Sequence, residues 1–324
     1  MSNTETSQEK VLGGIFFPFA TAAQARVQSQ GGRFVYYTTA AAALKILRNR
    51  EIWMRNTMTM NDVREVDHGL DCLMEAYNSN VGRELEAVLD NCFQGMSTEI
   101  KSQFNAWIPG IRYDTFVTCL SEHYSNEDRH GRLSMWRAYG GSSGVAIVIN
   151  GAAMFGTSRA LAAYSSPVAY LDSNGVADEL KAITQRIRQN QEFVKGIGRE
   201  RTKNILFHAL RFSAVCTKHP AFQEEKEWRV VASPSIESSD LVPKEIEDVY
   251  GVPQLVLKIK LEDHLDRGLR GLEPRDLIDR VLIGPCDHPD VVCRAFRETL
   301  TALGVPDAGN RAYGTGVPLR TRRP

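Results

Sequence analysis

Short runs of apolar and β-branched residues alternate along this chain with longer stretches in which apolar positions recur every three or four residues. Residues 33–39 combine aromatic and β-branched side chains, which predicts a strand. Thr39 is placed to cap a helix, and the alanine-rich residues 40–49 have high helix propensity, so a helix is predicted next. The ordered part of the chain therefore begins with a strand and a helix in immediate succession.

The same patterns predict further elements along the rest of the chain. Strands are predicted over residues 51–54, 113–121, 144–149, 168–170, 228–232, 255–259 and 281–283. Helices are predicted from Asn61-Asp62 onward and over residues 83–93, 133–139, 178–215 and 289–303, with a break near Gly196 and Gly198. Strands and helices alternate irregularly, and helices cluster between groups of strands. This arrangement predicts an α+β fold with a mixed or mainly antiparallel β-sheet core and flanking helices.

Composition and charge are those of a globular protein with a sizeable core, since 43% of the 324 residues are apolar. Residues 1–32 are polar and predict an N-terminal extension, whose apolar segment 15–19 we expect to dock on the core. The remaining residues 33–324 are predicted to form one domain. Basic and acidic residues number 39 each, so no global basic field favours bulk binding of nucleic acid. No stretch resembles a membrane span or a signal peptide, and a cytoplasmic protein without a membrane partner is expected.

The strongest candidate for chemistry is the segment Glu225-Lys226-Glu227, which directly precedes the apolar run 228–232. If that run is a buried strand, the two glutamates lie at its mouth in a partly dry cleft. Low dielectric strengthens the interaction of a carboxylate with a developing cation, so such a position suits catalysis. The alternative is a solvated acidic loop before a strand, because charge runs usually face water.

Other polar and aromatic groups lie at the ends of predicted elements. On a strand, Tyr36 and Thr38 share one face and Tyr37 takes the other. Trp136 and Tyr139 lie three residues apart, so a helix would place them on one side. That aromatic pair can either stack on a planar ligand ring or fill the core.

The ordered set of motifs resembles a bacterial family of unknown function, the DUF2971 proteins. The resemblance extends over roughly residues 33 to 318. Its motifs correspond to Tyr36-Tyr37-Thr38, Asn61-Asp62-Val63-Arg64-Glu65, Phe116 through Glu122 with Ser121, Met135 through Gly140, Lys218 through Arg229, and Ile283-Gly284-Pro285. The set is specific as an ordered whole, although each motif alone is weak.

The same order is similar to the ADP-ribosyltransferase fold, with its split sheet and its glutamate at the start of a late strand. This resemblance implies NAD as the substrate, Glu227 as the catalytic carboxylate and Glu225 as its helper. It also implies that a set of side chains contacts NAD, namely Tyr36, Thr38, Ser121, Trp136, Arg137 and Tyr139. The candidates for binding the pyrophosphate of NAD are Arg137 together with Arg55, Arg129 and Arg132. The chain departs from the DNA-modifying members in having Tyr36 where they have histidine.

The chemistry that this resemblance implies is cleavage of the nicotinamide–ribose bond, which forms an oxocarbenium-like cation that a carboxylate stabilises without a metal ion. The expected function is an NAD-consuming mono-ADP-ribosyltransferase, acting as a bacterial toxin or anti-phage defence effector. Its acceptor would be a nucleic acid or a protein, and an antitoxin is a conceivable partner. Two alternatives remain open: an NAD glycohydrolase, and a non-catalytic sensor that binds a nucleotide or nucleic acid through the arginine-rich residues 122–137.

Overall fold

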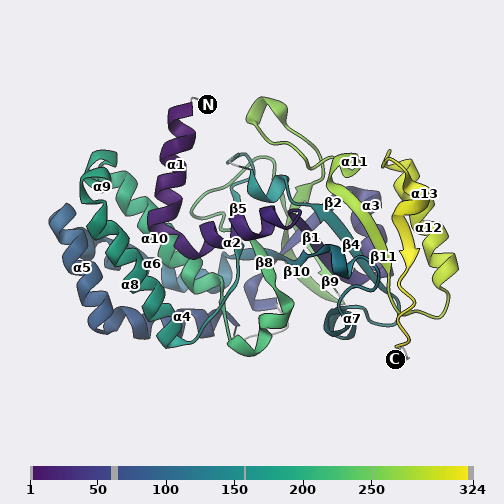
Figure 1. The fold of residues 1–324 in the computed structure, drawn as a ribbon, viewed down its shortest axis with the longest axis horizontal. Helices are drawn as coiled ribbons and strands as arrows, with labels where there is room; N and C mark the ends of the chain where they lie inside the picture. The colour runs from purple at the N-terminus through teal and green to yellow at the C-terminus, as the bar shows by residue number, and fades with distance from the viewer. Residues whose placement is uncertain (1–2, 60–64, 157, 250, 320–324) are drawn as a thin grey trace. The chain divides into compact units, whose positions relative to one another are not determined.

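The computed structural model describes residues 3–59, 65–156, 158–249 and 251–319 (Figure 1). Contacts within the chain divide it into two compact units, each built from three segments. Unit 1 comprises residues 1–25, 57–115 and 166–223, and unit 2 comprises residues 26–56, 116–165 and 224–324. These bounds differ from the predicted boundary between an N-terminal extension, residues 1–32, and a domain, residues 33–324. The predicted helix start at Asn61-Asp62 lies outside the described residues.

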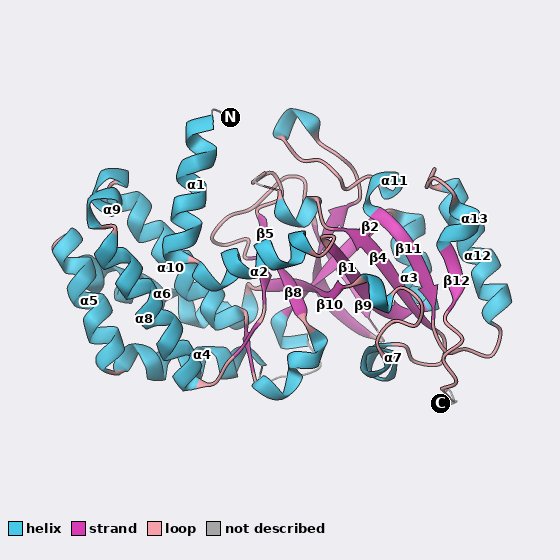
Figure 2. Cartoon of the chain, viewed as in Figure 1, coloured by secondary structure: helices cyan, strands magenta, loops and turns pink. Residues whose placement is uncertain are grey.

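Unit 1 is helical apart from a short parallel strand pair (Figure 2). Its helices are α1 (Asn3–Phe16), α2 (Pro18–Ser29, whose last turn belongs to unit 2), α4 (Glu65–Asn78), α5 (Asn80–Cys92), α6 (Met96–Tyr113), α8 (Ser173–Gln189), α9 (Gln191–Ile197) and α10 (Arg199–Val215). The strand pair is β6 (Ala169–Tyr170) and β7 (Thr217–Lys218). The predicted helical stretch 178–215 is confirmed, and its break falls at Gly198, which has φ 89°.

The N-terminal residues are helical rather than an irregular extension. Ile15 and Phe16 are buried, so the predicted docking of this apolar segment on a core is confirmed. Trp107 and Phe207 meet edge to face within unit 1, with ring centroids 6.0 Å apart. This aromatic contact joins α6 to α10.

Unit 2 is built on a large, mostly antiparallel sheet, in which the strand pair closest to the C-terminus is parallel. Its strands are β1 (Arg33–Thr39), β2 (Glu51–Asn56), β3 (Phe116–His123), β4 (Gly144–Asn150), β5 (Ala163–Pro167), β8 (Glu227–Ala232), β9 (Lys244–Val249), β10 (Val252–Lys260), β11 (Ile278–Ile283) and β12 (Ala312–Gly314). The order is β12-β11-β4-β1-β3-β2-β10-β9, with β8 paired to β3 and β5. The predicted α+β class with a mixed, mostly antiparallel sheet and flanking helices is confirmed.

The helices of unit 2 cover the sheet and its ends (Figure 1). They are α3 (Ala40–Asn49), α7 (Leu133–Tyr139), α11 (Pro274–Leu277), α12 (Pro289–Ala302) and α13 (Ala308–Arg311). Thr39 caps α3 as predicted, because its side-chain oxygen accepts a hydrogen bond from the backbone nitrogen of Ala42 at 3.3 Å. Met135 and Trp136 of α7 pack against the sheet.

The registers of β1, β3 and β8 decide which side chains share a face of the sheet. Val35 pairs with Ser121, and Ser121 pairs with Glu227. Directly opposed residues point to the same face, and neighbours along a strand point to opposite faces. Tyr37 therefore shares a face with Glu227, whereas Tyr36 lies on the other face.

Candidate active site

The segment that links the two candidate glutamates is sharply turned. A short 3₁₀ helix, η4 (Pro220–Glu225), ends at Glu225, and β8 begins at Glu227. Lys226 between them has φ 47°, in the left-handed region that costs a non-glycine residue about 1–2 kcal/mol. Its carbonyl accepts a hydrogen bond from the backbone nitrogen of Glu122 at 2.9 Å, and its ammonium lies 4.5 Å from the ring centroid of Tyr124. Strained backbone held by its surroundings is a recurring property of functional sites.

Glu227 is buried beside the fully buried Arg229. The two residues alternate onto one face of β8, and the Arg229 Nε donates to Glu227 Oε1 at 2.8 Å. The carboxylate of Glu227, which was predicted to lie at the mouth of a cleft, is thus neutralised inside the protein by the guanidinium of Arg229. A buried ion pair of this kind resists removal of either partner alone.

Glu225 is the more accessible of the two candidate carboxylates, because its side chain is only half-buried. The Tyr139 hydroxyl of α7 lies 3.3 Å from Glu225 Oε1 and donates to it. The backbone carbonyl of Glu225 accepts a hydrogen bond from Ser121 Oγ at 2.7 Å. Three of the residues implied by the resemblance, Glu225, Ser121 and Tyr139, are therefore in direct contact.

Arg132 holds the backbone of the turn that contains Glu224 and Glu225 in place. Its Nη1 donates to the carbonyls of Glu224 at 2.7 Å and Glu225 at 3.0 Å, and its Nη2 donates to the carbonyl of Glu122 at 2.6 Å. Its Nε also pairs with Glu127 at 3.0 Å. This guanidinium is buried and occupied, so the expectation that Arg132 binds a pyrophosphate is corrected: it holds the acidic turn in place.

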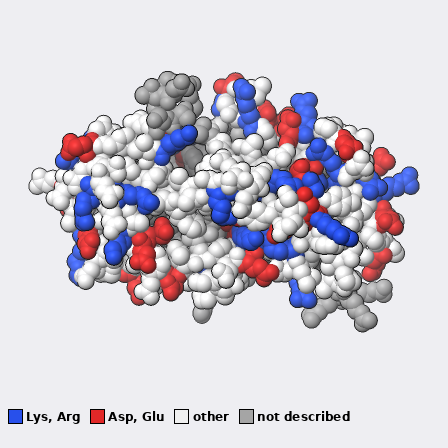
Figure 3. All heavy atoms as spheres, in the orientation of Figure 1, with Lys and Arg blue, Asp and Glu red and all other residues white. Residues whose placement is uncertain are grey.

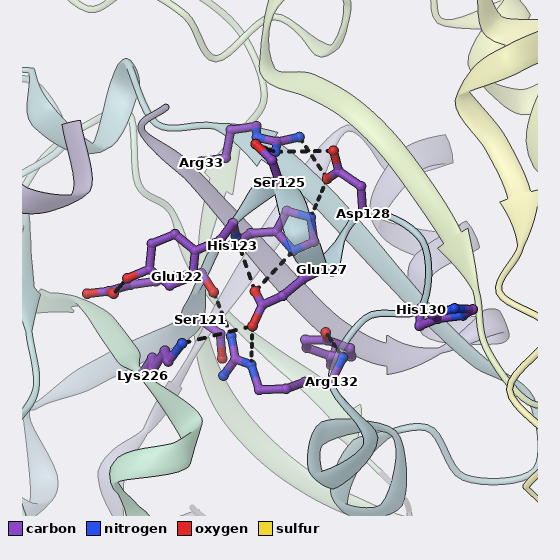
Figure 4. A network of polar contacts seen from close by, with 12 residues as sticks. Arg33, Ser121, Glu122, His123, Ser125, Glu127, Asp128, His130, Arg132 and Lys226 are labelled. Carbon is purple, nitrogen blue, oxygen red and sulfur yellow. Dashed lines mark hydrogen bonds and ion pairs between the residues drawn. The ribbon is translucent and has the colours of Figure 1, made fainter. Parts of the chain in front are cut away.

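The loop between β3 and α7 lies within the arginine-rich residues 122–137 and carries a polar network that Figure 4 shows. The Nε2 of the buried His123 lies 2.8 Å from Asp128 Oδ1, and Asp128 pairs with Arg33 at 2.9 Å. Burial lowers the pKa of His123, although the hydrogen bond to Asp128 opposes this effect. The only sign in the sequence was the density of charged residues in a segment that ends a buried strand.

Glu122 lies on the opposite face from Glu227 and is also anchored. Arg26 reaches its two carboxylate oxygens at 2.6 and 2.7 Å, and Trp228 Nε1 donates to it at 2.9 Å. Tyr124 donates a further hydrogen bond. Burial favours the neutral acid, but these donors outweigh it and hold the pKa of Glu122 below its usual value.

Two of the residues expected around NAD lie away from Glu227. Tyr36 and Thr38 point to the other face of the sheet, because the register places Tyr37 on the face of Glu227. Tyr37 accepts a hydrogen bond from the backbone nitrogen of Arg132 at 2.8 Å, and burial raises its pKa to about 12. The predicted alternation of Tyr36 and Thr38 against Tyr37 is therefore confirmed, and Tyr37 is the strand tyrosine connected to the acidic turn.

Trp136 fills the core, which is the packing alternative for the aromatic pair. It is buried, and its ring meets that of Tyr37 edge to face with centroids 4.8 Å apart. The backbone of Gly284 lies so close that a Cβ there would approach the indole to 2.6 Å. Of the two alternatives left open for Trp136, the structure therefore supports core packing.

The remaining candidate arginines differ in their surroundings. The guanidinium of Arg55 donates hydrogen bonds to the side chain of Gln254. In the sheet, Arg55 lies opposite Val117 of β3, at the other end of that strand from Ser121. Arg129 and Arg137 are exposed and form no ion pair or hydrogen bond with any described residue. These two side chains are therefore free to meet an anion.

Charge on the surface is mixed. On the face that Figure 3 shows, lysine and arginine are interspersed with aspartate and glutamate. Among the helices that the structure describes, none has the length and apolar character to cross a membrane. In the same part of the chain, no three His, Cys, Asp or Glu side chains are grouped to hold a metal ion.

The match to known proteins covers the acidic turn and the helix that contacts it. No curated protein and no solved structure matches the chain. The DUF2971 family model, described as a protein of unknown function, matches residues 135–230, which include Tyr139, Glu225 and Glu227, and the resemblance in the motifs is thereby confirmed over this segment.

Proposed function

We propose that this protein is an NAD-consuming mono-ADP-ribosyltransferase whose reacting centre is the turn that carries Glu225 and Glu227. The observation that carries the proposal is the setting of Glu225. A half-buried carboxylate accepts a hydrogen bond from Tyr139, and its backbone is fixed by Ser121 and Arg132. A preorganised carboxylate of this kind stabilises a cation without first having to reorient.

In the proposed reaction, the bond between the ribose anomeric carbon and the nicotinamide nitrogen breaks. Its electron pair leaves with nicotinamide, and the sugar becomes oxocarbenium-like. The Glu225 carboxylate faces this cation, and a hydroxyl or amine of the acceptor attacks the anomeric carbon. The proton of the acceptor passes to Glu225, so atoms and charge balance and the products are nicotinamide and the ADP-ribosylated acceptor.

The surrounding residues have separate roles in this scheme. Arg137 on α7 lies one helical turn beyond Ser134, whose hydroxyl donates to the Glu224 carboxylate at 2.8 Å. An arginine in this position suits the pyrophosphate of NAD, because its planar fork matches phosphate oxygens. Glu227, the carboxylate that the resemblance implies as catalytic, is buried and paired with Arg229. In this scheme the pair therefore maintains the start of β8, and Glu225, expected as the helper, takes the catalytic role.

The test is to incubate the purified protein with NAD and a cell lysate, and to follow nicotinamide release and transfer of labelled ADP-ribose. We expect Glu225→Gln to lower both by about 10²–10⁴-fold, the usual contribution of a positioned acid or base. Glu224→Gln, an exposed neighbour, is the matched control and should retain most of the activity. Full release and transfer by Glu225→Gln would contradict the proposal.

Two outcomes of this test correspond to other functions. Release of nicotinamide without transfer would identify an NAD glycohydrolase, in which water attacks the sugar. Absence of release, together with a rise in Tm on adding NAD, would identify a non-catalytic nucleotide sensor. The sensor is favoured by one observation, namely that the charge of Glu227 is already neutralised by Arg229.

The biological role that goes with the transferase is that of a toxin or anti-phage effector whose acceptor is a nucleic acid or a protein. Expression of the wild-type chain in bacteria should then slow growth and lower cellular NAD, whereas Glu225→Gln should do neither. A gene product that restores growth when co-expressed would be the neutralising partner.

A further inference from the structure

Unit 1 contains an apolar cavity of about 90 Å³, which is lined by residues of unit 1. It is lined by the junction of α1 and α2, by α8 and α10, and by residues next to β6 and β7. Phe16, Leu180 and Leu206 are among its walls and are buried. Since about 10–15 Å³ of such volume holds one water molecule, the cavity has room for about six to nine heavy atoms.

One carboxylate faces this apolar space. Glu179 of α8 lines the cavity, and it accepts no hydrogen bond and forms no ion pair with any described residue. Its pKa is raised by burial and by the neighbouring Asp178, and the charge of Arg186 only partly offsets this. A carboxyl group that lines an apolar cavity without an ion pair or hydrogen bond is unusual, because such groups are normally paired.

Two hydroxyl groups accompany the carboxylate in the lining of the cavity. Ser213 and Thr217 contribute to it, and neither side chain makes a hydrogen bond with a described residue. Together with Glu179 they offer acceptors to a group that carries several N–H donors. An ammonium has three such donors and a charge opposite to that of the carboxylate.

We propose that this cavity binds a small primary ammonium ion with an apolar chain or ring of about five carbons. The apolar part fills the space between α8 and α10, and the ammonium group pairs with Glu179. A carboxylate ligand of the same size is excluded by like-charge repulsion. A neutral alcohol binds through its apolar part alone and therefore more weakly.

The proposal is tested with three probes of matched size: n-pentylamine, pentan-1-ol and pentanoate. Their binding to the full chain is measured by calorimetry and by the shift in Tm at pH 7. We expect pentylamine to raise Tm by at least about 3 °C at saturation, pentanol to raise it less and pentanoate to leave it unchanged. Equal effects of all three probes, or none from pentylamine, would overturn the proposal.

Three variants assign the effect to the cavity. Glu179→Gln keeps the size of the side chain. It should weaken the binding of pentylamine at least 10-fold and leave the binding of pentanol unchanged. Asp178→Asn, an exposed neighbour that does not line the cavity, is the matched control and should bind like wild type. Ala209→Leu, which fills the cavity, should abolish binding of pentylamine and pentanol.

The Tm of each variant without ligand shows whether it is folded. If Ala209→Leu does not fold, Glu179→Gln and Asp178→Asn decide between the outcomes. Retention of the preference for pentylamine over pentanol in Glu179→Gln would refute the assignment to this carboxylate.

Discussion

Glu227 and Arg229 form an ion pair at 2.8 Å in which both side chains are buried on one face of β8. Removing one charge leaves the other without compensation in the interior, which typically costs about 3–5 kcal/mol. We therefore expect Glu227→Met and Arg229→Met each to lower the free energy of unfolding by that amount.

The double variant is the informative comparison for this pair. Replacing both charges with apolar side chains of similar volume is often neutral or stabilising. The double variant Glu227→Met with Arg229→Met should therefore have a free energy of unfolding, measured in urea, within about 1 kcal/mol of the wild-type value. Additive losses in the double variant would show that the two side chains do not act as a pair.

Arg132 should influence activity without touching the substrate. Its contacts with the carbonyls of Glu224 and Glu225 are made by two guanidinium donors that a lysine cannot reproduce. Arg132→Lys should lower the rate of nicotinamide release by about 10²-fold, because small displacements of a catalytic group are costly. A loss in kcat with an unchanged KM for NAD is the signature of this positioning role.

The control for Arg132 is Arg188→Lys, on the exposed side of α8. It should leave both kcat and KM unchanged. If Arg132→Lys mainly raised KM instead, the guanidinium would be binding NAD, contrary to the geometry.

The left-handed conformation of Lys226 gives a prediction about stability. Both Lys226→Gly and Lys226→Ala remove the contact with the Tyr124 ring, but only glycine relieves the strain at φ 47°. Lys226→Gly should therefore be about 1 kcal/mol more stable than Lys226→Ala in equilibrium unfolding. Equal stability of the two variants would mean that the turn is not strained.

Stability should fall with acid in two separate ranges. The pKa of His123 is lowered from 6.5 by burial, so the folded state binds fewer protons and loses stability as the pH falls below 6.5. The pKa of Glu122 is lowered from 4.5 because its hydrogen-bond donors outweigh burial, so its contribution is complete above pH 4.5 and is lost below it.

Urea midpoints measured from pH 8 to pH 3 separate these two contributions. His123→Asn should flatten the upper range, and Glu122→Gln should flatten the lower one. A variant of His123 with the wild-type dependence between pH 6.5 and 5 would contradict the assignment of the upper range to this imidazole.

Local sequence patterns were sufficient to predict those helices and strands whose residues have a strong propensity and a clear start or end signal. The strand 33–39 and the helices 40–49 and 133–139 have the predicted bounds, because each combines propensity with a clear start or end. Strand β9 was missed because its sequence is mostly charged, and it is a strand only through pairing with β10. Helix α6 was missed as well, and it contains Pro109 in its interior.

The candidate site was predictable in its residues but not in its arrangement. The turn at Glu225 and Glu227 was identified from the charges next to an apolar run. That Tyr37 rather than Tyr36 shares a face with Glu227 depends on the registers of β1, β3 and β8, which are set by long-range pairing. The same holds for Arg132, whose buried contacts give no local signal in the sequence.

The central position of β3 has a consequence for how the protein is made. β3 pairs with β1, with β2 and with β8, and the contact between Ser121 and Glu225 alone joins residues 104 positions apart. During synthesis, the backbone groups along one edge of β3 remain unpaired until β8 has left the ribosome. Because the loops to be closed are long, the sheet should fold slowly, and the turn that carries the glutamates can form only after β8 has been synthesised.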